Sequence, residues 1–447
     1  MDGSLVLQLA VLLGVIFLGV RLGGMAIGYT GGLGVAVLAL GLGMKPGHIP
    51  SDVILIIMAV IAAIASMQLA GGLDYLVRIA ERILRRNPKN ITFLAPAVTY
   101  GLTLLAGTGH TAYSMMPVIV EVAKGENIKP SAPLSVAVVA SQIAITASPV
   151  SAAVVFISGV LEPLGVSYPV LLLIWISTTF TACMLTALLV NLFSDLDLSK
   201  NPEYLRRVRA GLLSPSDKKE ERKADLPAGA RKSVAIFTLG VLAVVIYACL
   251  ISPAVGLVKE PVLPRDGAIV SFMMLIAATI VMVCRLDTGK LMEMSTFKSG
   301  MAACVCVLGV AWLGDTFIAG HIDAVKESAS ALVKAYPWLL AVALFFASML
   351  LYSQAATAKA LMPAVILALG ITPEHTEGVT ILVASFAAVS ALFVLPTYPT
   401  LLGAVQMDDT GSTRIGRFVF NHSFLIPGVV AIVLAVALGF VVAPMLI

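Results

Sequence analysis

The chain contains two sets of interruptions inside long apolar stretches, and the sets occur in the same order in its two halves. The first set is Gly107-Thr108-Gly109-His110 followed by Thr146-Ala147-Ser148-Pro149-Val150-Ser151. The second set is Ser353-Gln354-Ala355-Ala356 followed by Leu395-Pro396-Thr397-Tyr398-Pro399-Thr400. In a membrane, backbone that leaves helical geometry is tolerated only where it is buried in protein or lines a cavity. Two such places in corresponding halves predict a secondary transporter with its site between the halves.

The composition places the chain in a membrane. Hydrophobic residues make up 59% of the sequence, charged residues make up 12%, and the mean hydropathy is +1.00. A soluble protein would have to expose a large apolar surface at this composition. The sequence has no basic stripe for nucleic acid and no HExxH, GxSxG or paired buried carboxylates, which argues against a nucleic-acid-binding protein and an intramembrane enzyme. The five cysteines lack zinc or redox spacing, so we expect no metal and no cofactor.

Ten apolar stretches are long enough to cross the hydrocarbon core of a bilayer. They are 5–20, 24–44, 52–72, 133–160, 168–194, 233–255, 267–284, 301–320, 376–407 and 422–446. In each half an amphipathic stretch and two shorter apolar arms follow the third of these stretches, and the arms predict re-entrant hairpins at 91–124 and 338–371. The expected fold is therefore an all-α polytopic membrane protein. Its inverted repeat has five transmembrane helices plus one re-entrant hairpin in each half, 1–194 and 233–447.

The positive charges predict the orientation of this arrangement. The segment 195–232, expected to be a solvated cytoplasmic linker, holds ten of the 29 Lys and Arg residues. Because positive residues concentrate in cytoplasmic loops, both termini are predicted to be periplasmic. An odd number of spans in each half places the two halves in opposite orientations. The glycines Gly24, Gly28 and those at 31–34 are expected to permit close helix packing.

The spacing within the two halves agrees with a repeat. A proline follows the hairpin tip by nine residues in both halves, from Thr108 to Pro117 and from Gln354 to Pro363. The alternative is that Pro and Gly simply kink transmembrane helices without a functional role.

The interruptions supply the candidate substrate-binding residues. A hairpin tip presents unpaired N–H groups and a helix N-terminus, which favour an anion, while hydroxyl and amide side chains add neutral hydrogen bonds. Two opposed tips suit a compact dicarboxylate, with one carboxylate at each tip. The candidates are Gly107, Thr108, Gly109, His110, Ser148, Pro149, Ser151, Ser353, Gln354, Thr397, Tyr398 and Thr400.

Three ionisable residues within or beside the apolar segments are further candidates, because charge in lipid is costly. His110 could pair with a carboxylate or carry a coupling proton, or it could be a neutral histidine bonded to backbone. Asp315 could be a cation or proton site, or a helix-end residue at the interface. Lys359 could snorkel, neutralise a substrate carboxylate or stand in for a bound cation.

Several runs together resemble the Dcu family of anaerobic C4-dicarboxylate transporters, nearly from end to end. Besides the four interruptions, they are Gly71-Gly72-Leu73-Asp74, Ala80-Glu81, Leu84-Arg85-Arg86-Asn87-Pro88-Lys89, Ile415-Gly416-Arg417-Phe418-Val419 and Asn421-His422-Ser423. The resemblance implies a bacterial inner-membrane carrier of fumarate, malate, aspartate and succinate. It would work as an antiporter or by cation-coupled uptake, with H+ or Na+ as the coupling ion.

The hairpin arrangement is also similar to that of the divalent anion/sodium symporters, members of the ion-transporter superfamily. This similarity implies a homodimer in membrane lipid, with a scaffold domain and an elevator-like transport domain. Some members of the resembled family partner a sensor kinase, which could dock on the linker. The alternative function is a carrier of the same architecture that moves another organic anion or an amino acid.

Overall fold

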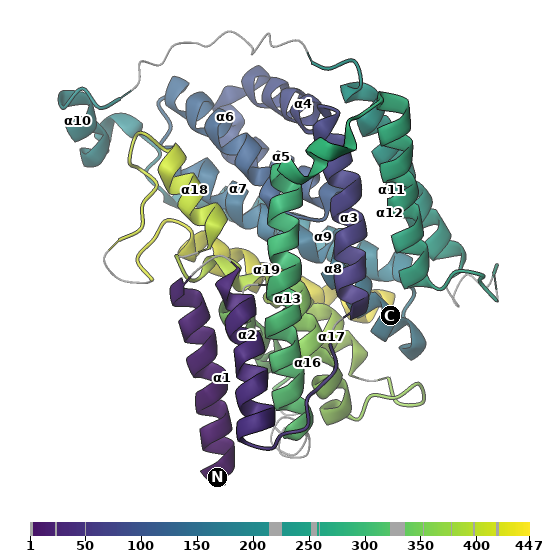
Figure 1. The fold of residues 1–447 in the computed structure, drawn as a ribbon. Coiled ribbons are helices and arrows are strands. Elements are labelled where there is room, and N and C mark those ends of the chain that lie inside the picture. The colour runs from purple at the N-terminus through teal and green to yellow at the C-terminus, as the bar shows by residue number, and fades with distance from the viewer. Residues whose placement is uncertain are drawn as a thin grey trace.

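The computed structural model describes most of the chain. The described residues are 3–22, 25–49, 51–213, 226–251, 257–258, 260–321, 336–351, 353–376, 378–396, 398–416 and 420–447. They form helices joined by short loops (Figure 1), and the only β-structure among them is three isolated bridges. The expected all-α class is confirmed for this part of the chain.

The first half supplies helices α1 to α9, with short 3₁₀ turns between some of them. They are α1 (Gly3–Leu22), α2 (Ala26–Ala36), α3 (Ser51–Leu69), α4 (Gly72–Arg86), α5 (Ile91–Ala106), α6 (Ala112–Gly125), α7 (Ser131–Ile143), α8 (Ala152–Leu161) and α9 (Tyr168–Phe193). A π-helical turn η1 (Val37–Gly41) extends α2. The 3₁₀ turns are η2 (Pro88–Asn90), η3 (Gly109–Thr111), η4 (Ala144–Thr146) and η5 (Glu162–Leu164).

The remainder begins with the short elements η6 (Leu198–Lys200) and α10 (Pro202–Arg209). The second half then supplies α11 (Ala230–Leu250), α12 (Arg265–Cys284), η7 (Thr288–Glu293), α13 (Ser295–Gly320), α15 (Leu339–Leu351), α16 (Gln354–Leu369), α17 (Val379–Ser385), η8 (Phe386–Phe393), α18 (Pro399–Met407) and α19 (Leu425–Leu446).

Helices from the two halves pack against each other in matching pairs. Helix α2 packs on α13, and α3 packs on α12. Within each half, α1 packs on α2 and α11 packs on α12. Elsewhere α6 packs on α18 and α8 on α16, and α9 packs on α19. Helix α5 lies on α7 in the first half, and α15 lies on η8 in the second. The two halves therefore contact each other along several helices.

Five helices in the described residues are long and apolar enough to span a membrane by length and composition: α9, α11, α12, α13 and α19. Helices α3 and α4 would form a sixth span, but they are bent by 73° at Gly71, whose φ is +82°. The other predicted spans correspond to shorter helices or to helices that break partway, such as α7 to α8. The expected amphipathic stretch after α3 is α4, which buries Ala80 and Leu84. Its counterpart in the second half falls mainly on residues outside the described part.

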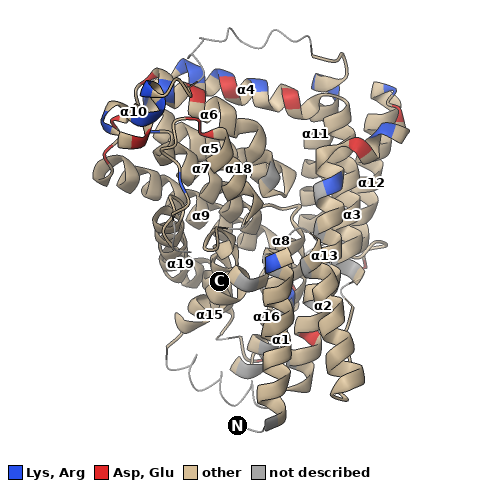
Figure 2. Cartoon of the chain, turned by 60° about the vertical axis from the view of Figure 1, so that its left-hand side comes forward, with Lys and Arg blue, Asp and Glu red and all other residues tan. Residues whose placement is uncertain are grey.

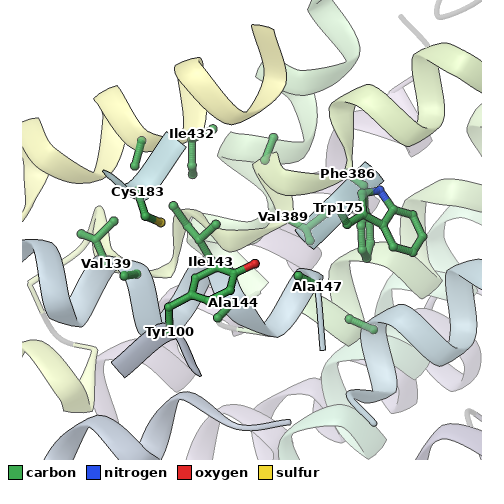
Figure 3. Close-up of a cluster of buried hydrophobic side chains, with 14 of the residues drawn as sticks. Tyr100, Val139, Ile143, Ala144, Ala147, Trp175, Cys183, Phe386, Val389 and Ile432 are labelled. Atoms are coloured by element: carbon green, nitrogen blue, oxygen red, sulfur yellow. The ribbon is translucent and has the colours of Figure 1, made fainter. Parts of the chain in front are cut away.

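Aromatic packing fixes the broken helices in the core. Trp175 of α9 donates an indole hydrogen bond to the Val383 carbonyl at 3.1 Å, and its ring lies 4.7 Å from that of Phe386. Figure 3 shows these rings beside Val389, with Ile143 and Ala147 of the first broken helix in the same cluster. A buried indole gains from having a hydrogen-bond partner as well as apolar contact. The two interrupted helices therefore share one hydrophobic core.

Close packing of α2 on α13 depends on glycine. Gly28 and Gly31 face the backbone of α13, and a methyl group added at Gly31 would lie 2.5 Å from the Gly309 carbonyl carbon. No side chain fits there without a shift of the helices. The prediction that these glycines permit close approach is confirmed for Gly28 and Gly31. It is wrong for Gly32, where an added methyl group would meet nothing within 4 Å, while Gly34 faces the side chains of Val15 and Leu313. Gly24 lies outside the described residues.

Charged side chains gather at one end of the molecule, around α4, α6 and α10, and the N-terminus lies at the other end (Figure 2). The start of the linker folds onto this end. Lys129 pairs with Asp195 at 2.7 Å, and this contact lowers the pKa of the Asp195 carboxyl. Arg207 of α10 donates to the carbonyl of Asp409 at 2.9 Å. Specific polar contacts therefore hold residues 195–209 at this end, although most of their side chains are exposed. The cytoplasmic linker stays a prediction. Residues 214–225 lie outside the described part.

Candidate functional site

The first hairpin is α5, a tip at residues 107–111, and α6. Gly107 ends α5 with a φ of +68°, a conformation that favours glycine, and its N–H bonds the Thr103 carbonyl at 2.8 Å. The hydroxyls of Thr103 and Thr111 lie 3.0 Å apart, and Thr111 donates to the Thr108 carbonyl at 3.2 Å. These bonds hold the tip in one shape. The His110 side chain lies outside the described part.

The second hairpin is α15 and α16, which meet at Ser353. The Ser353 hydroxyl accepts the N–H of Ala356 at 3.2 Å, as an N-cap does, and Thr357 donates to the Ser353 carbonyl at 2.7 Å. Helix α16 therefore begins at Gln354, with its positive end at the tip. Pro117 in α6 and Pro363 in α16 lie inside the second arms of their hairpins, as their common spacing from the tips predicted.

The first broken helix leaves helical geometry between η4 and α8, and its polar groups tie it to neighbouring backbone. Ser148 is fully buried and donates to the Leu104 carbonyl in the last turn of α5 at 2.7 Å. Ser151 caps α8 by accepting the Val154 N–H at 3.2 Å, and it donates to the Ile145 carbonyl at 2.6 Å. The break therefore holds the C-terminal end of the first hairpin arm.

Further ties fix the two breaks from outside. Tyr168 donates its hydroxyl to the Pro149 carbonyl at 2.8 Å. In the second broken helix α18 begins at Pro399, after the Tyr398 N-cap, and Thr400 is fully buried. His422 contacts the Val394 carbonyl through Nε2 at 2.9 Å. The predicted candidate Thr397 lies outside the described residues.

Both tips meet at Gln142, in the last turn of α7, which sequence reasoning did not select. Gln354 donates its amide to the Gln142 carbonyl at 3.2 Å, and Gln142 Nε2 lies 3.5 Å from the Thr400 hydroxyl. A methyl group at Gly109 would lie 2.5 Å from the same Nε2 atom. The structure thus brings together both tips and the second broken helix around one buried amide. The one feature of the sequence that could have identified Gln142 is a polar amide beside Ser141 inside an otherwise apolar run.

The two remaining ionisable candidates contact other parts of the chain. The Asp315 carboxylate accepts the His48 N–H at 2.5 Å, while Thr316 accepts the Gly47 N–H at 3.0 Å. These bonds hold the extended segment after α2 against α13. Lys359 of α16 lies over the Phe156 ring, with its Nζ 6.0 Å from the ring centre. The described residues contain no cluster of three His, Cys, Asp or Glu side chains that could hold a metal.

Comparisons with known proteins agree with this architecture and cover the full chain. Residues 4–447 match the family model described as "Anaerobic c4-dicarboxylate membrane transporter". The "C4-dicarboxylate transporter DcuA" of Wolinella succinogenes is 64% identical over 442 residues, covering 99% of this chain and 100% of that protein. The proteins of the same name from Helicobacter pylori strain 26695 and Escherichia coli K12 are 63% and 55% identical, each over 98% of both chains.

A solved structure supports the fold at low sequence identity. The Alcanivorax borkumensis YdaH transporter superposes with a TM-score of 0.56 at 15% identity, covering 92% of this chain and 87% of its own. Together with the apolar helices, these comparisons make the chain a multi-pass membrane protein. The chain belongs to the family of anaerobic C4-dicarboxylate membrane transporters, and it is a transporter rather than an enzyme.

Proposed function

We propose that this protein moves C4-dicarboxylates, namely fumarate, malate, succinate and aspartate, across the bacterial inner membrane. The observation that carries the proposal is the meeting of the two hairpin tips and the second broken helix at Gln142. Helix N-termini at Gln354 and Pro399 bring positive dipole ends to this region. A small dianion placed there would meet the N-terminal N–H groups of these two second-half helices and would lie beside the first tip at Gly109.

The substrate would be exchanged by alternating access of an inverted repeat. The counterparts in the two halves are α1 and α11, α2 and α12, α3 and α13, α6 and α16, and α8 and α18. When each helix is replaced by its counterpart, the α2–α13 contact becomes α12–α3, α6–α18 becomes α16–α8, and α1–α2 becomes α11–α12, and all of these contacts are present. This agreement supports two structurally equivalent halves. The helices α1 to α3 and α11 to α13 would form the scaffold of a homodimer. The hairpins and broken helices would form the moving elevator-like part.

The charge distribution supports the proposed orientation. Lys and Arg gather around α4 and α10, at the end of the molecule away from the N-terminus (Figure 2). By the positive-inside rule this end would face the cytoplasm and the N-terminus the periplasm. The proposed periplasmic C-terminus follows from the even number of spans, ten, that the sequence predicts. Cysteine labelling of single residues at the two ends, with a membrane-impermeant reagent in intact cells, tests this orientation.

Counterflow in proteoliposomes tests the transport proposal. Vesicles with purified full-length protein are loaded with unlabelled succinate, and uptake of labelled fumarate is measured with and without sodium and a pH gradient. Exchange without either gradient would identify antiport, and dependence on one ion would identify the coupling ion. Uptake that C4-dicarboxylates fail to compete, while another organic anion or amino acid does compete, would refute the proposed substrate class.

A further inference from the structure

The amide of Gln142 is only half satisfied. The side chain is fully buried, and its Nε2 end contacts the hydroxyls of Ser141 at 3.3 Å and Thr400 at 3.5 Å. Its Oε1 end has no hydrogen-bond partner among the described residues. A buried acceptor without a donor is costly, and such atoms in folded proteins usually have a partner when the protein works.

In this amide orientation the described neighbours of Gln142 do not supply that donor, since the Thr400 hydroxyl accepts from Nε2 at 3.5 Å. Ser141 donates its own proton to the Val138 carbonyl at 2.7 Å, and Gln354 donates to the backbone carbonyl of Gln142, not to its side chain. Among the described residues, three buried hydroxyls also lack hydrogen-bond partners, those of Ser385, Ser390 and Thr413. A hydroxyl can both donate and accept, whereas an amide oxygen can only accept. The missing partner of Oε1 must therefore be a donor.

The position of Gln142 suggests where the donor comes from. The residue lies between the first tip at Gly109 and the second tip at Gln354, in the region where the proposed substrate would be held. Fumarate and succinate dianions carry acceptors only. A C4-dicarboxylate with an amino or hydroxyl group at carbon 2 carries a donor in addition to its carboxylates.

We propose that Gln142 Oε1 accepts a hydrogen bond from the 2-ammonium or 2-hydroxyl group of a C4-dicarboxylate, and so favours such substrates over unsubstituted ones. This inference rests on the proposed transport function and assigns its specificity. With an unsubstituted dianion bound, the oxygen stays unsatisfied and faces additional negative charge. With aspartate or malate bound, the same oxygen is satisfied. Gln142 then acts on the relative affinity of substrates more than on transport as such.

The test compares inhibition constants in proteoliposomes that take up labelled fumarate. Gln142→Met keeps the length of the side chain and removes the acceptor. We expect the inhibition constant of aspartate to rise by roughly ten-fold relative to that of fumarate, as expected for loss of a hydrogen bond to a charged group. The matched control is Gln68→Met, since Gln68 bonds Ser295 and Thr296 away from the tips and should leave the ratio unchanged.

Two results would overturn the inference. One is an equal rise in the inhibition constants of fumarate and aspartate in Gln142→Met. This result would mean that the amide is turned and donates to a carboxylate common to all substrates. The other is an unchanged ratio. If the parent protein transports no C4-dicarboxylate at all, the proposed function fails before any variant is compared, so the two failures are distinguishable.

A measurement on the unmodified protein covers the case in which the variant does not fold. Malate and 2-methylsuccinate have similar size, but only malate has a donor at carbon 2. We expect malate to compete for fumarate uptake several-fold better than 2-methylsuccinate. Equal competition by the two compounds would contradict the proposal without any substitution.

Discussion

Replacing Gly31 by Ala should destabilise the protein, while the same change at the next residue should not. Gly31 is buried in α2, and an added methyl group would lie 2.5 Å from the carbonyl carbon and 2.7 Å from the carbonyl oxygen of Gly309. Ordinary contact begins at 3.4 Å, so α2 and α13 would have to separate locally by about 0.9 Å. Because the obstructing atoms are backbone, no side-chain rotation can relieve the clash. A methyl group at Gly32 would meet nothing within 4 Å.

The expected magnitude follows from comparing the two variants. Both replacements gain the same helix propensity, about 0.5–1 kcal/mol for Gly to Ala. The difference between them isolates the steric cost, which for overpacking is about 1–3 kcal/mol. Gly32→Ala should therefore be neutral or slightly stabilising. The unfolding free energy of Gly31→Ala should be lower than that of Gly32→Ala by about 1–3 kcal/mol.

Reversible unfolding in mixed detergent micelles measures the difference. Trp312 of α13 donates to the Gly47 carbonyl at 2.9 Å, so its fluorescence reports on the same helix. Equal unfolding free energies for Gly31→Ala and Gly32→Ala would refute the argument that backbone contact at this crossing requires glycine.

Three further predictions concern the site and the charged end. Ser148→Ala leaves the Leu104 carbonyl without its donor and should lower the unfolding free energy by about 1–3 kcal/mol; a roughly five-fold loss of substrate affinity at unchanged stability would instead make Ser148 a ligand-binding residue. Lys124→Met removes the 2.7 Å ion pair with the loop after α18 and should cost roughly 1 kcal/mol in chemical unfolding, whereas Lys200→Ala, at a side chain 70% exposed, should be neutral. The His110 hypothesis is that a protonated imidazole pairs with a bound carboxylate, so that substrate affinity falls as the pH rises. His110→Gln keeps hydrogen bonding but cannot take up a proton, so it should retain some exchange and flatten this fall; a pH profile identical to the parent's would exclude His110.

The positions of the helix breaks could be predicted from the sequence because glycine and proline determine them locally. The segments 91–124 and 338–371 contain the helix pairs α5 with α6 and α15 with α16, and the helix breaks occur at the expected prolines. That the two pairs are re-entrant in the membrane stays a prediction. The partners of the polar residues could not be predicted in the same way. Ser148 was expected to face substrate, but in this structure it bonds a carbonyl 44 residues away in the chain. Its role in binding stays a prediction.

Long-range polar contacts account for what sequence reasoning missed. Gln142 has no local signature beyond its polarity, and its importance arises only when residues 212 and 258 positions away meet it. The docking of α10 likewise depends on Arg207 meeting a carbonyl 202 residues further along the chain. Such contacts are set by how helices pack, which the pattern of a single chain does not encode directly.

The serine hydroxyls at the interruptions bond main-chain groups, and this limits which mutations the protein can tolerate there. Ser148, Ser151 and Ser353 each fix a helix end by bonding backbone groups. Random mutagenesis at these serines should therefore yield misfolded variants far more often than variants with a new substrate range. New specificity would have to arise at the few side chains that face the ligand, so this design favours conservation of substrate class over long divergence.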